Sequence, residues 1–363
     1  QNATNGNLLV RTDTGTQTLS AANGALNLQA GTGSGTSVSV GAASGSQIVA
    51  ADALNLTGGS FGTNNTSSLF AGGAAQTIPP SGSAGMQLAG GGGTGADGNN
   101  SAIVTYSGTG AQSLTVNSGG NLIITGGSSA LQNVGAGNGS RALIESTATG
   151  NQTITLSGGN LTLQGGSVGS RNYAALFADL ASQTISGVNL LTLHGGNTGG
   201  VATEGNRATI QAGINQSISA TSIALTGGND GTENYARILL YGPGAATQTV
   251  GANALTLQGG LAGGGLGTGN FALIQSEANQ NINVAGNLTM TGGSGPLTDN
   301  GAYIQTSTGS SGTQSITLTS GGSLTMTGGS STATTVGATH GSRALIFSGG
   351  AAQLVQLSGG GSI

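Results

Sequence analysis

The chain contains no cysteine and no lysine, and charged residues make up only 4% of its 363 positions. Without cysteine it has neither a disulfide framework nor a thiolate metal site. Six arginines stand against ten acidic residues, so there is no basic stripe to bind nucleic acid or an anionic membrane surface. No apolar run approaches the roughly 20 residues that span a bilayer. We therefore expect neither a nucleic-acid partner nor a membrane-spanning segment.

Glycine, in contrast, is abundant, with 74 copies. A glycine-rich chain is often disordered, but disorder is typical of chains with high charge and little aliphatic content. This chain has little charge, and its aliphatic residues recur periodically. Collagen is excluded because the glycines lack a strict three-residue spacing. The composition therefore favours a folded, repetitive structure.

A glutamine recurs eleven times, each time just ahead of an aliphatic-rich segment and usually followed by Thr or Ser. The gaps between successive copies run from 29 to 40 residues. A period near 33 with variable spacing predicts a solenoid whose loops differ in length. The recurring residues are Gln17, Gln47, Gln76, Gln112, Gln152, Gln183, Gln216, Gln248, Gln280, Gln314 and Gln353.

One repeat, residues 140–166, shows the unit clearly. Residues 141–145, 152–156 and 160–164 each alternate aliphatic and polar side chains, which predicts three half-buried strands joined by glycine turns. The alternation places Ile144, Ile154 and Leu161 on one inward face. We therefore predict an all-β fold, a right-handed parallel β-helix of about eleven three-strand coils with a period of about 33 residues. Residues 1–363 are expected to form a single solenoid, uncapped at both ends.

The recurring glutamine shares the inward face with the aliphatic residues. Burying an unbonded amide costs roughly 1–3 kcal/mol, so each side chain needs a partner. Stacked coils provide one, because each amide can donate to the carbonyl of the glutamine one rung below, as in cross-β stacks. We predict a structural glutamine ladder. The alternative, a row of glutamines gripping a ligand, would need them on the outside.

A recurring asparagine, followed by a large residue, precedes the first strand of several coils. Asn tolerates left-handed turn geometry and stacks well, so it suits this corner. The large residue after each Asn is expected to join an outer stack held by packing and cation–π contacts. A carbohydrate-binding strip is the alternative interpretation. The pairs are Asn172 with Tyr173, Asn206 with Arg207, Asn234 with Tyr235, and Asn270 with Phe271.

A glycine-led phrase also recurs, as Gly-Gly-Asn-Leu-Thr-Leu at 158–163, Gly-Asn-Leu-Thr-Met at 286–290 and Gly-Gly-Ser-Leu-Thr-Met at 321–326. This phrase resembles the repeat shafts of filamentous haemagglutinin-like exoproteins, which bacterial two-partner systems secrete. The resemblance implies a secreted right-handed β-helix that acts as an adhesin or a surface filament.

Residues for catalysis are sparse. Ten acids spread over eleven coils give little basis for the paired carboxylates of a glycosidase, and no Ser/His/Asp arrangement is identifiable. We expect no catalytic residues, no cofactor and no metal centre. The weak calcium candidates are Asp97, within a single partial match to a calcium-binding nonapeptide, and the loop residues Asp230 and Glu233.

The sequence therefore predicts a non-catalytic, secreted structural protein of the extracellular space or bacterial surface. The favoured role is a filament subunit whose partner is itself, stacked head to tail. The first alternative is the shaft of a secreted adhesin that binds surface glycans. More distant alternatives are an ice-binding protein, suggested by Thr-Met-Thr at 289–291 and 325–327, and a polysaccharide-degrading enzyme.

Overall fold

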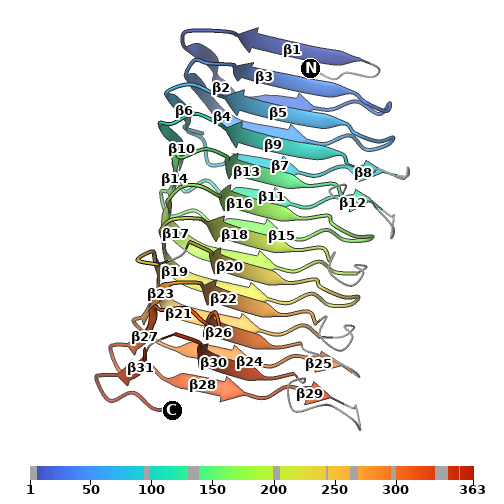
Figure 1. The fold of residues 1–363 in the computed structure, drawn as a ribbon. Coiled ribbons are helices and arrows are strands. Elements are labelled where there is room, and N and C mark those ends of the chain that lie inside the picture. The colour runs from blue at the N-terminus through green and yellow to red at the C-terminus, as the bar shows by residue number, and fades with distance from the viewer. Residues whose placement is uncertain are drawn as a thin grey trace.

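The computed structural model describes residues 6–93, 99–129, 139–198, 205–242, 244–261, 269–295, 300–331, 342–350 and 352–363. Within these ranges every regular element is a β-strand, and the strands stack rung upon rung along one axis (Figure 1). The predicted all-β parallel solenoid is confirmed. The expected number of coils is close to the observed one, since the sheet that opens the coils has eleven strands.

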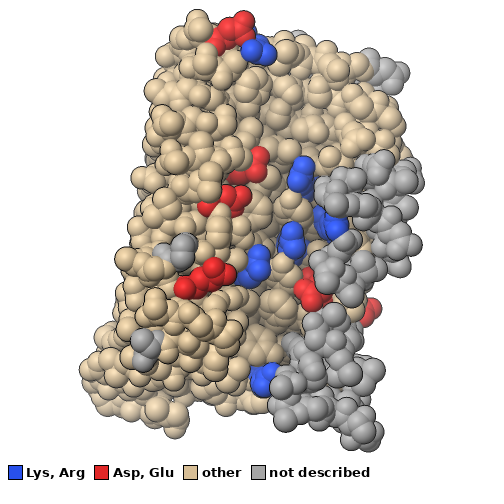
Figure 2. All heavy atoms as spheres, viewed as in Figure 1, with Lys and Arg blue, Asp and Glu red and all other residues tan. Residues whose placement is uncertain are grey.

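We call that sheet the front sheet because it faces the viewer in Figures 1 and 2. Its strands pair in parallel, with each Ala at the start of β13 and later strands in register with the Ala of the next coil. The front sheet contains β1 (Asn7–Thr12), β3 (Ser37–Ala42), β5 (Thr66–Ala71), β9 (Ser101–Tyr106), β13 (Ala142–Ser146), β16 (Ala174–Ala178), β18 (Ala208–Ala212), β20 (Ala236–Leu240), β22 (Ala272–Ser276), β26 (Ala302–Thr306) and β30 (Ala344–Ser348).

The second and third segments of the coils form one sixteen-stranded sheet. In some coils they are separate strands: β6 (Ala75–Ile78), β7 (Gly85–Ala89), β10 (Ala111–Val116), β11 (Leu122–Thr125), β14 (Asn151–Leu156), β15 (Leu161–Gln164), β23 (Asn279–Val284), β24 (Leu288–Thr291), β27 (Thr313–Leu318), β28 (Leu324–Thr327) and β31 (Ala352–Leu357). In others they run on as one long strand: β2 (Gln17–Gln29), β4 (Gln47–Thr57), β17 (Gln183–His194), β19 (Gln216–Thr226) and β21 (Thr247–Gln258). Two short pairs flank the coils: β8 (Gly92–Gly93) with β12 (Ser128–Ser129), and β25 (Ser294–Gly295) with β29 (Ser330–Ser331).

The chain follows a right-handed path. In Figure 1 the front strands run to the left and the strands behind them run to the right while the chain descends from β1 to β31. This is the hand expected for parallel strands joined by crossovers, because right-twisted strands favour it.

The core is a continuous column of aliphatic side chains along the axis. In β14 the alternation leaves Ile154 and Leu156 buried, and in β15 it buries Leu161 and Leu163. Because the register is kept, Leu161 stacks on equivalent aliphatic residues in the coils on either side. Full burial of each such side chain contributes about 1.5–3 kcal/mol. Each coil thus completes its core only against its neighbours, which is typical of solenoids.

Candidate functional site

The glutamines form an unbroken ladder inside the solenoid. From Gln47 to Gln353, each side-chain amide donates to the carbonyl oxygen of the preceding glutamine, at N–O distances of 2.5 to 3.0 Å. The nine members from Gln47 to Gln314 are at most 1% exposed. Because these amides are buried and bonded to one another, they stabilise the coils and are out of reach of a ligand in solution.

Asparagines form a second ladder at the corner ahead of the front sheet, with a different bonding pattern. Here the side-chain carbonyl of each Asn accepts the backbone N–H of its counterpart one coil earlier. Asn172 N–H, for example, donates to Asn206 Oδ1 at 2.9 Å. The ladder contains Asn172, Asn206, Asn234 and Asn270, and also three members that the sequence reasoning missed, Asn65, Asn100 and Asn300.

The four residues of the predicted outer stack lie in one column on the front sheet. The Arg207 guanidinium lies 5.1 Å from the Tyr173 ring centroid and donates to the Tyr235 hydroxyl at 3.0 Å. The Tyr235 and Phe271 rings are stacked with centroids 4.8 Å apart and an interplanar angle of 5°. Tyr235 is only 6% exposed. The neighbours therefore cover the aromatic faces, and a sugar ring could not stack on Tyr235.

Three further side chains extend this column. Arg141 donates to the Tyr173 hydroxyl at 3.1 Å, and the Arg237 guanidinium lies 5.2 Å from the Tyr235 ring. At the far end, the rings of Tyr303 and Phe271 meet in a T-shaped arrangement, with centroids 6.3 Å apart and an interplanar angle of 69°. Sequence reasoning missed these three because no Asn directly precedes them, although the alternation within the first strands already marks them as outward-facing.

Charged side chains gather on this face. Figure 2 shows a line of arginines on this face, with acidic side chains on both sides of it. Burial raises the pKa of the Glu145 carboxyl, and it also raises that of Glu233, against the opposing charges of Arg207 and Arg237. Burial likewise lowers the pKa of the Arg237 guanidinium. The face therefore holds opposite charges close together in a partly dehydrated setting.

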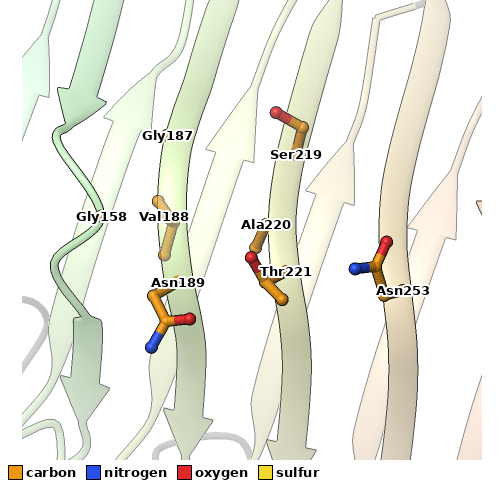
Figure 3. Close-up of a pocket in the computed structure, with 8 residues that line it drawn as sticks. All are labelled: Gly158, Gly187, Val188, Asn189, Ser219, Ala220, Thr221 and Asn253. Atoms are coloured by element: carbon orange, nitrogen blue, oxygen red, sulfur yellow. The ribbon is translucent and has the colours of Figure 1, made fainter.

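A shallow hollow lies elsewhere, along the corner between the second and third segments of β17, β19 and β21 (Figure 3). The corner is short here, since Ile223 follows Gln216 by seven residues, whereas Leu324 follows Gln314 by ten. The hollow has a volume of about 400 Å³. Its lining has no ionisable side chain, so it offers hydrogen bonds without acid–base chemistry. The lining residues are Gly158, Gly187, Val188, Asn189, Ser219, Ala220, Thr221 and Asn253.

Two of the weak calcium candidates, Asp230 and Glu233, lie in one loop and have other interactions. Asp230 accepts its bond from the N–H of Gly231 at 2.7 Å, which closes a local turn, and Glu233 is opposed by two arginines. Asp97 lies outside the described residues. In the part of the chain that the structure describes, no group of three or more metal-ligating side chains is found.

Comparisons with known proteins give no relative: no family model, no curated protein and no solved structure matches the chain. Among the residues with described positions there is also no helix long and apolar enough to cross a membrane. The fold and its two ladders are therefore the observations on which a function can be built.

Proposed function

We propose that this chain is a non-catalytic extracellular structural protein, a stiff rod that stacks end to end with copies of itself into a filament. The observation that carries the proposal is the unbroken glutamine ladder, which keeps one register from Gln17 to Gln353. A rod with one register offers the same hydrogen-bonding pattern at each rung. Another copy could therefore continue the pattern by strand addition.

In the proposed filament the joint would lie between the first and last rungs. In β31, Val355 is in register with the core residue Ile316 of β27, yet Val355 is 37% exposed. In β1, Val10 is 48% exposed although its in-register partner Val40 is buried. Unpaired parallel strands with inward aliphatic residues are templates for further pairing. Stacking would bury these residues and bring Gln17 of the next copy to Gln353.

Negative-stain electron microscopy over a concentration series tests the proposal. We expect unbranched fibres of constant width at high protein concentration. Val355→Lys should abolish them, because an inward lysine would be buried without a partner at the joint, which costs several kcal/mol. Leu354→Lys is the matched control, since Leu354 lies in the same rung, is 54% exposed and pairs with the outward Ser315.

The alternative is the shaft of a secreted adhesin, of the kind that the haemagglutinin-like phrases indicate. In that case the end rungs would continue into further coils of a longer protein. Isolated rods about 50 Å long, the rise of ten gaps of about 4.8 Å, would favour this alternative at every concentration. Fibres that persist with Val355→Lys would show that assembly does not use this end.

A further inference from the structure

The corner hollow of Figure 3 is one part of a longer groove. A second hollow of about 320 Å³ adjoins it and shares Ser219, Ala220 and Asn253 with it. Their combined lining reaches from Gly158, after β14, to Thr319, after β27. The five steps between these coils, at about 4.8 Å each, give a length of roughly 24 Å for what we call the corner groove. The second hollow is also lined by Gly251, Ala252, Asn283, Val284 and Ala285.

The corner groove exists because four successive coils have short corners. In these coils the first core residue of the third segment follows the ladder glutamine by seven or eight residues. These core residues are Leu191, Ile223, Leu255 and Leu288. In the coils at the two ends of the groove, Leu161 and Leu324 follow their glutamines by nine and ten residues, so longer corners bound the groove on both sides. Between them the floor residues are in register from coil to coil, namely Val188, Ala220, Ala252 and Val284.

The side chains beside this floor are polar and available for bonding. Asn189, Thr221 and Asn253 lie on three successive coils (Figure 3). Within the described part of the chain, the side chains of Thr221 and Asn253 make no hydrogen bond. Asn189 uses one amide N–H, toward Asn160 at 3.3 Å, and keeps its carbonyl oxygen. Amides and hydroxyls both donate and accept hydrogen bonds, and neither lining contains an ionisable side chain.

We propose that the corner groove binds a linear, uncharged glycan with β-1,4 linkages. A neutral ligand fits because a charge placed here would lose water without gaining an opposite charge. The polar side chains repeat once per rung of about 4.8 Å, and a sugar unit in an extended β-1,4-linked chain advances by a similar distance. Successive sugar units would therefore meet equivalent amides and hydroxyls. An extended peptide advances by about 3.3 Å per residue and does not match this repeat.

Saturation-transfer NMR with the full chain tests this, with cellopentaose and penta-N-acetylchitopentaose as probes. Maltopentaose is the counterpart, because it is neutral and has as many sugar units, but its α-1,4 linkages curve the chain. We expect transfer to at least one β-linked probe and weaker binding of maltopentaose. Thr221→Ala should weaken binding of that probe by about twofold to tenfold, the range for one neutral hydrogen bond. Thr256→Ala is the matched control, since Thr256 is exposed on β21 and lies outside the lining.

Inserting two glycines between Thr221 and Ser222 tests the shape of the groove separately from its hydrogen bonds. The corner of β19 would then be as long as the corner after β14 and would fill the middle of the groove, so binding should be lost while circular dichroism stays unchanged. The same insertion between Ser118 and Gly119, in the corner after β10, is the control and should leave binding intact.

Absence of transfer to both β-linked probes would overturn the proposal, as would equally strong binding of maltopentaose. Binding that survives the insertion after Thr221 would place the ligand elsewhere. An uncharged Gly-Ser peptide with blocked ends that binds as tightly would assign the groove to extended peptides instead. Because the groove lies along the side of the rod, each of these outcomes is independent of the proposed end-to-end stacking.

Discussion

Gln216 offers the most direct test of the glutamine ladder. It lies in the middle of the solenoid and is 1% exposed. Its amide donates to Gln183 Oε1 at 3.0 Å, and its own carbonyl accepts from Gln248 Nε2 at 2.8 Å. Gln216→Met keeps the length and approximate volume of the side chain and removes only the amide. The substitution therefore isolates the hydrogen bonds from the packing.

The expected loss of stability follows from the side-chain groups that the substitution leaves without a hydrogen-bond partner. Gln248 keeps a second acceptor, the carbonyl of Gln275 at 2.9 Å, so its amide stays satisfied. Gln183 Oε1 loses the donor that the ladder supplied, inside the core and away from water. An orphaned buried acceptor costs about 1–3 kcal/mol. We expect Gln216→Met to lower the free energy of unfolding by this amount.

Urea denaturation followed by circular dichroism measures the change, with hydrogen exchange of the β17 and β19 amides as a local readout, because solenoids can unfold in parts. Gln258→Met is the matched control: Gln258 faces outward on β21, and its amide bonds the carbonyl of Gly259 at 3.2 Å. The control should cost less than about 0.5 kcal/mol. Equal losses at the two positions would refute the ladder as a source of stability.

A double substitution sharpens the same test. Gln183→Met alone would strand both the Gln152 carbonyl and the Gln216 amide, which otherwise bond Gln183. When Gln216 is also Met, that amide is gone, and the Gln152 carbonyl is the orphan that remains. The double variant should therefore lose less than the sum of the single losses, by about 1 kcal/mol or more. Strict additivity would contradict the pairing.

Two more predictions concern the corner and the charged face. Asn206→Ala should cost about 1–3 kcal/mol in urea denaturation, because it leaves the buried N–H of Asn172 without its acceptor; Asn189→Ala, at an exposed position, is the control. Glu145 has a raised pKa when folded, so its contribution to stability is present below its ordinary pKa and is lost as pH rises through the raised value. Glu145→Gln should therefore reduce the loss of stability between pH 4 and pH 7, and an unchanged pH profile would contradict the burial of this carboxyl.

Much of the fold was predictable because its local and repeating patterns agree. Alternation places Ile154 and Leu156 inward, and the constant position of the glutamine ahead of them sets the register of neighbouring coils. The asparagine corner was predictable only in part. Asn172 stands before a tyrosine and was visible as one of a series, whereas Asn65 and Asn300 precede a threonine and a glycine and do not resemble the other members.

The hollows could not be predicted, since they arise from differences between coils rather than from the repeat. The corner hollow depends on β19 and β21 having shorter corners than the coils around them, and strand patterns do not reveal how such a corner folds. The Tyr303 ring fills the space beside Gly301, and this side-chain conformation cannot be read from the repeat either. A consensus of repeats describes the average coil, and these sites are departures from it.

In-register stacking also explains why the chain has so little charge. Neighbouring rungs place equivalent side chains about 4.8 Å apart, so a charge repeated in successive coils would face its like at close range. The outer column avoids this by alternation: Arg141 and Arg207 are separated by Tyr173, whose hydroxyl accepts from Arg141 and whose ring lies under Arg207. Tyr235 then separates Arg207 from further members of the column. The aromatic residues thus stabilise each guanidinium and keep Arg141 two rungs from Arg207, whereas Arg237 lies one coil from Arg207 with the Tyr235 ring beside both. A lysine, which lacks the planar surface for such stacking, would fit this column less well.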